Sequence, residues 1–377
     1  MRVTRSQVVA FRWRRHQLGR DVGSSAATAT DVLDLGIQDT GEGARWALSA
    51  RGALPPGDDD LVWAWTLRGA PHVYRRNDIA AVAVATAPYS EADASKRVFT
   101  AAKSLKAADL TVLGALEEVA AAMRKIVTRP TTKGELSGRL RAVLGEPFLV
   151  ACAVCDALHP YEQEFRLATL QAGLELEPGT SPPVLRRIPG LTPPMYAHLA
   201  TDAEPRFDVI RNYLRFFGPA RHRDVAAHLD APVKDVAVNW PDDVETVSLD
   251  GVTTDGKGGD WFVLAGDTGD VTDASTSKGV VRLLGAFDPY LQLRDRSLLV
   301  PDEAHRKDLW RTLGRPGAVV ADGEVVGTWR PKTSGGRLSV VFDPWTKVTS
   351  ALRSTIDDEA ERLAAYRGVE LAGVVDA

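Results

Sequence analysis

The first 75 residues carry their apolar side chains first at helical spacing and then in two short runs of strand-forming residues. Thr4 is a suitable N-cap for a helix that continues to Leu18, and shorter helices are expected over residues 30–35 and 43–50. Residues 61–75 contain two runs rich in strand formers around an Arg-Gly-Ala-Pro turn, which predicts a β-hairpin. Three helices followed by a hairpin is the element order of a winged helix.

The same order of elements is expected twice more along the chain. In the second round, three helices and two strands around a Pro/Gly turn are predicted at residues 110–126, 131 onward, 161–170 and 174–188. The third round begins near Arg206, and its first helix ends at Gly218-Pro219, a strong stop signal. Two short helices and a long hairpin follow, at residues 224–229, 233–238 and 244–264. Rounds that repeat at a spacing of about 100 residues indicate tandem units.

The last hundred residues show a different pattern, made of short β-prone runs. These runs are predicted at residues 280–284, 298–300, 318–321, 324–330 and 337–342. Asp322-Gly323 between two of them is a strong hairpin turn, and an amphipathic helix from about Ile356 to Arg367 closes the chain. The whole pattern predicts an α+β fold. Three tandem winged-helix units (residues 1–105, 106–195 and 196–275) precede a β-rich C-terminal region with a terminal helix (residues 276–377).

Composition fits a folded protein built from several units. The chain has 377 residues, more than one ordinary domain, and its 44% hydrophobic and 25% charged residues are typical of globular proteins. No apolar run approaches the roughly 18 residues that a membrane span needs, and arginines interrupt the N-terminus before a secretory signal could form. Two cysteines cannot make a disulfide framework, so a reducing, cytoplasmic location is expected.

Charge is distributed unevenly along the chain. The net charge of −4 gives no global sign of nucleic-acid binding, because nucleic-acid-binding domains are usually basic. Residues 2–20 nevertheless contain six arginines and no Asp or Glu. This segment is either a solvated helix face or a surface for phosphates, because a protein that is acidic overall can still present one basic groove.

Six segments of the chain resemble a known family and occur in that family's order. They are Leu35-Gly36-Ile37-Gln38-Asp39, Trp46-Ala47-Leu48-Ser49-Ala50-Arg51, Leu67-Arg68-Gly69-Ala70-Pro71-His72, Phe217-Gly218-Pro219-Ala220, Phe287-Asp288-Pro289-Tyr290 and Asp322-Gly323-Glu324-Val325-Val326-Gly327-Thr328-Trp329-Arg330. The ordered set resembles the winged-helix DNA-binding family that includes the AlkZ-type and YcaQ-type DNA glycosylases. In that family, three tandem winged helices and a β-rich region clasp a DNA duplex. The resemblance implies damaged double-stranded DNA as the partner, and we expect a monomer associated with the nucleoid.

The resemblance also implies a reaction, hydrolysis of the N-glycosidic bond of N7- or N3-alkylated purines, including bulky or crosslinked adducts. Alkylation of a ring nitrogen makes the base cationic and therefore a good leaving group. The enzyme must then stabilise positive charge on the departing sugar and aim a water at the anomeric carbon. An amide or carboxylate oxygen serves both purposes, and the family carries Gln-x-Gln or Gln-x-Asp for them.

The matching site in this chain is the turn Gln38-Asp39-Thr40, which implies Gln38, Asp39 and Thr40 as catalytic residues. Gln38 fits the first position, but Thr40 stands where the family has Gln or Asp. The segment from Gln38 to Arg51 is also shorter than in the Gln-x-Gln branch. Asp39 has two alternatives: it moves into the catalytic position through a local shift of the turn, or it caps the following helix.

Basic residues expected to contact DNA are Arg12, Arg14, Arg15, Arg45, Arg51, Arg68, His72 and Lys257. Arg68 lies beside a glycine in a hairpin turn, where the backbone can approach phosphate closely. His72 matches a histidine that the family often has in the first wing, and it either contacts phosphate or the lesion or stacks on Trp63 or Trp65. The 253–260 loop, which contains Lys257, either probes the minor groove or is a solvated hairpin.

No cofactor and no metal are expected. Cys152, Cys155 and His159 have a spacing that invites a zinc site, but a structural zinc needs four ligands and no second Cys/His pair exists. Packing of the cysteines in an apolar helix is the alternative. No glycine-rich phosphate loop before a helix, nucleophile elbow or His-x-x-x-His motif occurs in the sequence.

Two hypotheses about function follow. The first is a cofactor-free DNA glycosylase for alkylated purines, and the second is a non-catalytic winged-helix DNA-binding protein, such as a regulator or a lesion binder. A regulator usually has an effector pocket or a dimer interface, often on a long helix with heptads. The sequence shows neither heptads nor a ligand motif, which favours the enzyme.

Overall fold

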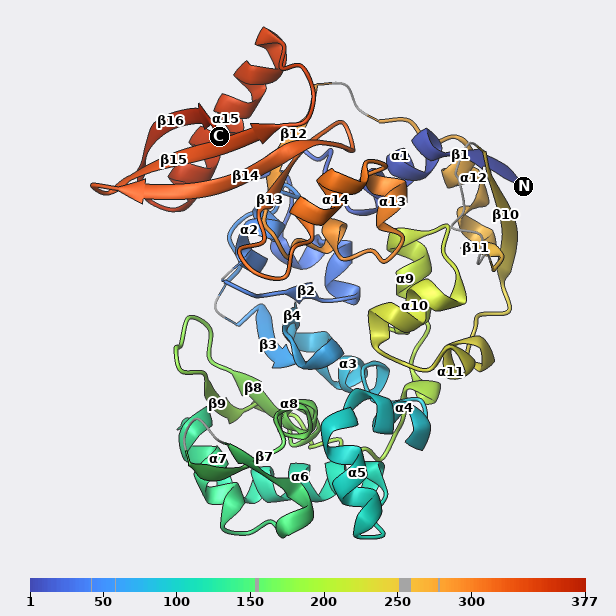
Figure 1. The fold of residues 1–377 in the computed structure, drawn as a ribbon, viewed down its shortest axis with the longest axis vertical. Coiled ribbons are helices and arrows are strands. Elements are labelled where there is room, and N and C mark those ends of the chain that lie inside the picture. The colour runs from blue at the N-terminus through green and yellow to red at the C-terminus, as the bar shows by residue number, and fades with distance from the viewer. Residues whose placement is uncertain (42, 58, 153–155, 251–258, 277–278) are drawn as a thin grey trace.

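The computed structural model describes residues 1–41, 43–57, 59–152, 156–250, 259–276 and 279–377. The fold is mixed α+β, with the C-terminal sheet and its helix at one end of the molecule and a group of helices at the other (Figure 1). The strands of the first hairpin lie between these ends. Within the described ranges, no helix is both long enough and apolar enough to cross a membrane.

The first segment contains the predicted helices and hairpin in order, and two short strands that were not predicted. Its elements are β1 (Arg2–Thr4), α1 (Arg5–Arg15), a 3-10 turn (Asp31–Asp34), β2 (Ile37–Gln38), α2 (Gly43–Ser49), β3 (Leu61–Trp65) and β4 (Pro71–Arg75); the strands β1 and β2 are the two that were not predicted. The side chain of Thr4 accepts a hydrogen bond from the backbone of Gln7, so the predicted cap of the first helix is confirmed. That helix buries Val8, Phe11 and Trp13 and ends at Arg15, earlier than expected.

The second segment adds helices and strands that complete one sheet. Its elements are α3 (Ile79–Ala85), α4 (Glu91–Arg97), α5 (Phe99–Ala107), α6 (Val112–Ile126), β5 (Thr131–Thr132), α7 (Lys133–Arg141), β6 (Leu149–Cys152), β7 (Ala157–Pro160), α8 (Glu162–Gln171), β8 (Leu174–Leu176) and β9 (Val184–Arg187). The sheet has the order β2-β4-β3-β8-β9-β5, and Trp63 pairs with Leu176 where the first hairpin meets the second. Strands on both sides of the expected boundary at residue 105 therefore share one sheet.

The β6–β7 hairpin was not predicted. Cys152 is the last residue of β6, so the expectation that it packs in a helix is wrong. Cys155 lies outside the described residues.

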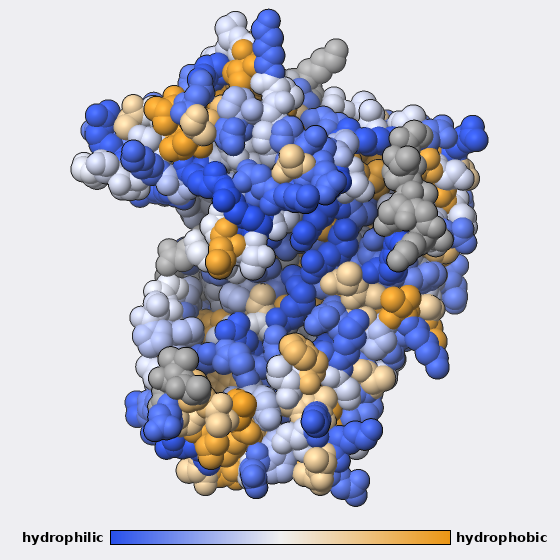
Figure 2. Space-filling view, in the orientation of Figure 1, coloured by the Kyte–Doolittle hydropathy of each residue, from blue (hydrophilic) through white to orange (hydrophobic). Residues whose placement is uncertain are grey.

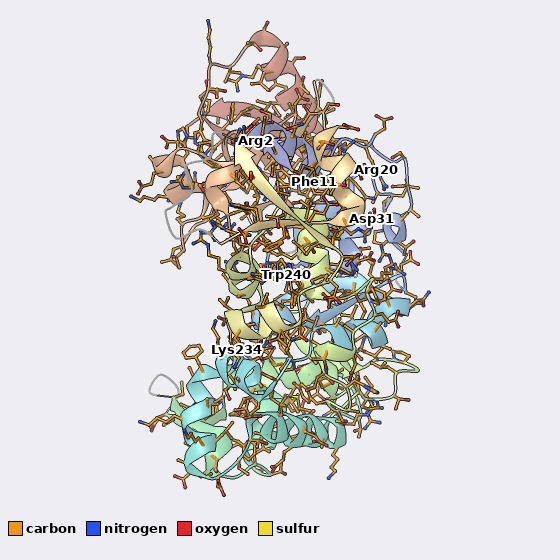
Figure 3. All side chains as sticks on the ribbon, turned by 90° about the vertical axis from the view of Figure 1, so that its right-hand side faces the viewer. Arg2, Phe11, Arg20, Asp31, Lys234 and Trp240 are labelled. Carbon is orange, nitrogen blue, oxygen red and sulfur yellow. The ribbon has the colours of Figure 1, made fainter. Side chains whose placement is uncertain are left out.

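The third segment follows the predicted order, and the N-terminal strand joins it. It consists of α9 (Val209–Phe217), α10 (His222–Leu229), α11 (Val233–Val238), β10 (Val244–Asp250), β11 (Trp261–Leu264) and α12 (Thr268–Thr272). Strand β1 pairs in parallel with β10, with Arg2 opposite Ser248. Figure 3 shows this side of the molecule, with labels on Arg2 of β1, Lys234 of α11 and Trp240, which follows α11 in the sequence. The Trp240 ring lies 5.5 Å from that of Phe262, which packs the helices on the hairpin.

The C-terminal region forms a five-stranded sheet, order β12-β13-β14-β15-β16, covered by a long helix. Its elements are β12 (Val281–Leu284), α13 (Arg296–Leu299), α14 (Glu303–Leu309), β13 (Gly317–Ala321), β14 (Glu324–Ser334), β15 (Arg337–Pro344), α15 (Ser350–Tyr366) and β16 (Glu370–Asp376). Asp322 and Gly323 have φ angles of 50° and 89°, as the hairpin turn predicted between them requires. The prediction of a strand at residues 298–300 is wrong, because α13 includes residues 298 and 299 and Val300 is its C-cap.

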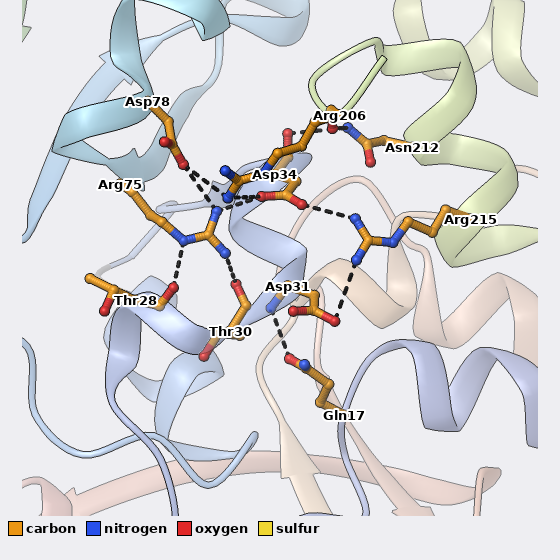
Figure 4. Close-up of polar contacts among 10 residues, drawn as sticks. All are labelled: Gln17, Thr28, Thr30, Asp31, Asp34, Arg75, Asp78, Arg206, Asn212 and Arg215. Carbon is orange, nitrogen blue, oxygen red and sulfur yellow. Dashed lines mark hydrogen bonds and ion pairs between the residues drawn. The ribbon is translucent and has the colours of Figure 1, made fainter. Parts of the chain in front are cut away.

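A buried carboxylate joins the first segment to the third. Asp34 receives Arg75 from β4, Arg206 from the loop before α9 and Arg215 from α9, at 2.5, 3.1 and 2.9 Å (Figure 4). Its side chain is 5% exposed, so an unpaired charge there would be costly, whereas three guanidinium groups compensate it. This contact fixes the segment that leads into β2 against α9.

Candidate active site

The Gln38-Asp39-Thr40 turn connects the edge of the six-stranded sheet to α2. Gln38 is the last residue of β2 and pairs with His72 of β4. The amide nitrogen of Gln38 donates to the hydroxyl of Thr40 at 2.9 Å, and Thr40 is exposed. No described residue donates a hydrogen bond to the amide oxygen of Gln38. Fixing the nitrogen on Thr40 thus leaves the oxygen as an acceptor.

Asp39 holds the turn together. Its backbone N–H donates to the carbonyl of Pro71 at 2.8 Å. One carboxylate oxygen accepts from the backbone N–H of Ala44 at 2.9 Å, and the other accepts from the indole N–H of Trp63 at 2.6 Å. Of the two alternatives for this residue, the structure shows the helix cap. The carboxylate is half-buried, and these two hydrogen bonds fix its orientation.

A groove with a volume of about 1150 Å³ opens on one side of this turn. It begins at Thr40 and extends between α2, the segments 285–288 and 315–317, strand β14 and the end of α15. Figure 2 shows a hollow on this face below the C-terminal sheet, with hydrophilic side chains along its edge. The groove is lined by four arginines, Arg45, Arg315, Arg330 and Arg367, together with the aromatic residues Phe287, Trp329 and Tyr366. Cations and aromatic rings in one concave surface suit a nucleic acid.

A small cavity lies next to the turn and is lined by Gln38, Arg68, His72 and His228, among others. His72 is 4% exposed, and its Nδ1 lies 2.9 Å from the carbonyl of Ala70. Burial, with repulsion from Arg68, lowers the pKa of His72 to about 3, so the ring is neutral at physiological pH. His72 is therefore too buried, and not positively charged, to contact a phosphate as a cation in this structure. The ring lies near Tyr74, at 6.3 Å, and not on Trp63 or Trp65 as one alternative had it.

Two of the expected DNA contacts are buried and paired with aspartates. Arg12 is 1% exposed and binds Asp295 at 2.6 Å. Arg51 is 0% exposed and forms a two-bond pair with Asp288, at 2.7 and 2.8 Å. The expectation that these arginines contact phosphate is wrong, because withdrawing either one would leave a buried carboxylate without its partner.

The remaining arginines of α1 face acidic residues from the third segment. Arg14 lies 3.9 Å from Asp270, and Arg15 pairs with both Asp267 and Asp270. Both side chains keep some exposure, but their charges are balanced by these aspartates. Helix α1 therefore does not present the basic surface that its sequence suggests.

The remaining expected DNA contacts are Arg45, Arg68 and Lys257. Arg45 is exposed, lines the groove and lies over the Trp63 ring at 5.4 Å. Arg68 has a left-handed φ of 57° at the hairpin turn and donates to the carbonyl of His228 at 2.5 Å. Burial and repulsion from Arg294 lower its pKa to about 10, so it stays charged at neutral pH. Lys257 lies outside the described residues.

Three arginines of the groove were not predicted. Arg330 ends a segment that carries the family resemblance, which could have singled it out, and it lies 3.7 Å from Asp308. Arg315 and Arg367 belong to none of the segments that carry the resemblance, so no sequence pattern marks them, and the fold brings them to the groove. Within the described ranges, no group of His, Cys, Asp or Glu side chains is arranged to hold a metal ion.

Comparison with known proteins supports a family assignment. The sequence profile of the family described as "DNA glycosylase AlkZ-like" matches residues 38–366, a span that starts at Gln38 and covers most of the chain. A search of curated protein sequences gave no match. Among solved structures, the DNA glycosylase AlkZ of Streptomyces sahachiroi is similar, with a TM-score of 0.72 and 21% identity over 100% of both chains. At this identity the likeness shows a shared fold.

Proposed function

Because the chain belongs to the AlkZ-like DNA glycosylase family, we propose that it hydrolyses the N-glycosidic bond of alkylated purines in duplex DNA. The proposed substrates are N7 and N3 adducts, with bulky and crosslinked purines among them. The proposal rests above all on the Gln38 turn. Its amide oxygen is unengaged by the described residues, Gln38 lines the small cavity, and Thr40 lines the basic groove.

Gln38 is the group that holds the attacking water. The hydroxyl of Thr40 accepts a hydrogen bond from the amide nitrogen of Gln38, so the lone pairs of the amide oxygen point away from that contact. An oxygen acceptor of this kind orients a water toward the anomeric carbon and also faces the positive charge that develops there. A cationic alkylated base leaves without protonation, so no general acid is needed.

Asp39 contributes a fixed negative charge. Its two bonds, from Ala44 and Trp63, use one lone pair of each carboxylate oxygen, and each oxygen can accept a further hydrogen bond. A carboxylate held in this way stabilises an oxocarbenium-like sugar through its charge and requires no movement of the turn. In this proposal Thr40 orients Gln38 and does not contact the sugar.

The reaction is monofunctional, with water as the nucleophile. A glycosylase that also cuts the strand attacks with an amine, and neither hollow beside the turn is lined by a lysine among the described residues. Their arginines stay protonated and cannot act as nucleophiles. The product is therefore a free base and an abasic site in an unbroken strand.

The test is release of N7-methylguanine from methylated duplex DNA. The wild type should release the base and leave a strand that breaks only after alkaline treatment. Gln38→Ala should lower the single-turnover rate by about a hundredfold. If the wild type releases no base from methylated, bulky-adduct or crosslinked duplexes, the proposal is wrong.

One observation favours the alternative, a non-catalytic lesion binder: both oxygens of Asp39 are engaged in structural bonds. Trp63→Phe removes one of these bonds and leaves the carboxylate in place. If Asp39 acts on the sugar, this variant should release base several-fold more slowly while binding DNA normally. A binder would instead retain damaged duplex in preference to undamaged duplex and release no base in either form.

A further inference from the structure

Four arginines near the Gln38 turn gather without a carboxylate partner. They are Arg68, Arg294, Arg296 and Arg315, called here the arginine cluster. All four side chains are half-buried, and within the described ranges none forms an ion pair with Asp or Glu. Half-buried cations normally acquire an anionic partner, because burial without one is unfavourable.

Specific contacts hold the arginine cluster in place. Arg296 lies over the Trp310 ring at 5.0 Å, and the Trp310 indole donates to the carbonyl of Leu291 at 2.9 Å. Arg315 donates to the same carbonyl at 3.4 Å and lies over the Phe287 ring at 5.2 Å. These guanidinium groups are therefore positioned by aromatic and backbone contacts and not by opposite charges.

The acids of this segment point elsewhere. Asp295, between Arg294 and Arg296 in the sequence, turns inward to Arg12. Asp288, close to Phe287, turns inward to Arg51. The buried arginines thus withdraw both aspartates from the surface on which the arginine cluster lies.

The charges of the cluster act on one another. Burial, with repulsion from Arg296 and Arg294, lowers the pKa of Arg315 to about 10, and burial with repulsion from Arg294 lowers the pKa of Arg296. Asp230 acts on Arg68 and Arg294 without forming an ion pair with either. The Nε–H groups of Arg294, Arg296 and Arg315 are buried and have no hydrogen-bond acceptor in the structure. These Nε–H groups are themselves closed to an incoming ligand, but half-buried guanidinium groups gathered without a carboxylate suit an anion.

The arginine cluster reaches both hollows beside the turn. Arg68 lines the small cavity with Gln38, and Arg315 lines the groove that begins at Thr40. We propose that the arginine cluster binds a backbone phosphodiester of duplex DNA next to the nucleotide that Gln38 faces. Guanidinium groups match the oxygens of a phosphate in pairs, and a phosphate held there would fix the register of the strand against the turn. The identity of that nucleotide rests on the proposed function, whereas the phosphate site does not.

The experiment measures binding of undamaged duplex DNA as a function of salt. The double variant Arg296→Gln/Arg315→Gln should bind about tenfold more weakly, and the slope of log affinity against log salt should shrink by about one phosphate contact. Arg353→Gln is the matched control, because Arg353 pairs with Asp376 at 2.7 Å on the exposed side of α15. It should leave both quantities unchanged. An unchanged slope in the double variant, or no binding of duplex by the wild type, overturns the proposal.

A second variant separates charge from packing. Arg296→Lys/Arg315→Lys retains both charges and should restore most of the salt slope. It should do so even if weaker stacking on Trp310 and Phe287 lowers the midpoint of thermal unfolding. No recovery with lysine would assign the loss to packing and contradict the phosphate site.

A third measurement distinguishes DNA phosphate from free phosphate. If inorganic phosphate, compared with chloride at equal ionic strength, protects the wild type from thermal unfolding while the salt slope is the same in the double variant, the site holds a small anion and not DNA. Because base release is not measured in any of these experiments, a wild type that binds duplex but excises nothing would refute the proposed function and leave the phosphate site standing.

Discussion

Helix α1 and the segment from residue 285 to 317 both carry several arginines, but the two sets differ in whether a carboxylate pairs with them. In α1, Arg12 is buried against Asp295, and Arg14 and Arg15 face aspartates of the third segment. In the later segment, Arg294, Arg296 and Arg315 keep their charges without a carboxylate partner in the described structure. The segment whose local sequence looks basic is neutralised, and the segment whose local sequence looks mixed is left positive.

The difference lies in where the acids point. Asp295 and Asp288 belong to the later segment in sequence but serve the arginines of the first segment in space. A run of arginines therefore marks a DNA surface only if no acid from elsewhere in the fold reaches it. The surface offered to DNA is set by tertiary pairing more than by local composition.

The largest effect is expected from breaking the buried pair in α1. Arg12→Met leaves Asp295 buried without its partner and should lower the free energy of unfolding by about 3–5 kcal/mol. Urea denaturation measures this loss, and Asp295→Leu in the same chain should recover much of it. Arg296→Gln, which breaks no ion pair, should cost less than about 1 kcal/mol. Equal costs for Arg12→Met and Arg296→Gln would erase the contrast between the two segments.

A smaller effect is expected on DNA affinity. Arg45→Gln removes an exposed cation from the groove and should weaken duplex binding about threefold at low salt. Arg14→Gln, whose charge Asp270 already balances, should change affinity by less than half as much on a logarithmic scale. Fluorescence anisotropy with one duplex measures both. A greater loss of affinity in Arg14→Gln than in Arg45→Gln would mean that α1 contacts DNA.

The smallest effect is an absence of titration beside the arginine cluster. With a pKa of about 3, the His72 ring should show constant NMR shifts from pH 8 to pH 5. In the unfolded chain this histidine is protonated below its usual pKa of about 6.5, whereas in the folded chain it stays neutral. The free energy of unfolding should therefore fall as the pH falls below about 6.5. A ring midpoint near pH 6.5 would mean that Arg68 and burial do not act on His72 as the structure indicates.

Much of the fold could be predicted from the sequence, because its signals are local. The Thr4 cap, the stop at Gly218 and the Asp322-Gly323 turn each depend on a few adjacent residues, and the structure confirms all three. Pairing of β1 with β10 was not predicted, because the paired residues, such as Arg2 and Ser248, are far apart in the sequence. The run at 298–300 was too short for its apolar residues to distinguish a strand from the helical turn that forms.

The candidate site was predicted only in part. The Gln38 turn and Arg45 could be located from sequence segments, and the structure brings both to the groove. The burial of Arg51 and the arrival of Arg315 and Arg367 at the same groove could not be predicted, because each depends on contacts between residues far apart in the chain. Asp39 left two alternatives open because the same carboxylate suits a cap and a catalytic charge, and only the partners Ala44 and Trp63 distinguish them.

In the proposed function, the amide oxygen of Gln38 promotes base release while arginines elsewhere bind the duplex. The most direct test compares wild type and Gln38→Ala for both quantities, with duplex binding by anisotropy and N7-methylguanine release under single-turnover conditions. We expect affinities equal within about twofold and a release rate lowered by about a hundredfold. A variant that releases the base at the wild-type rate, or one that loses binding and rate together, would contradict it.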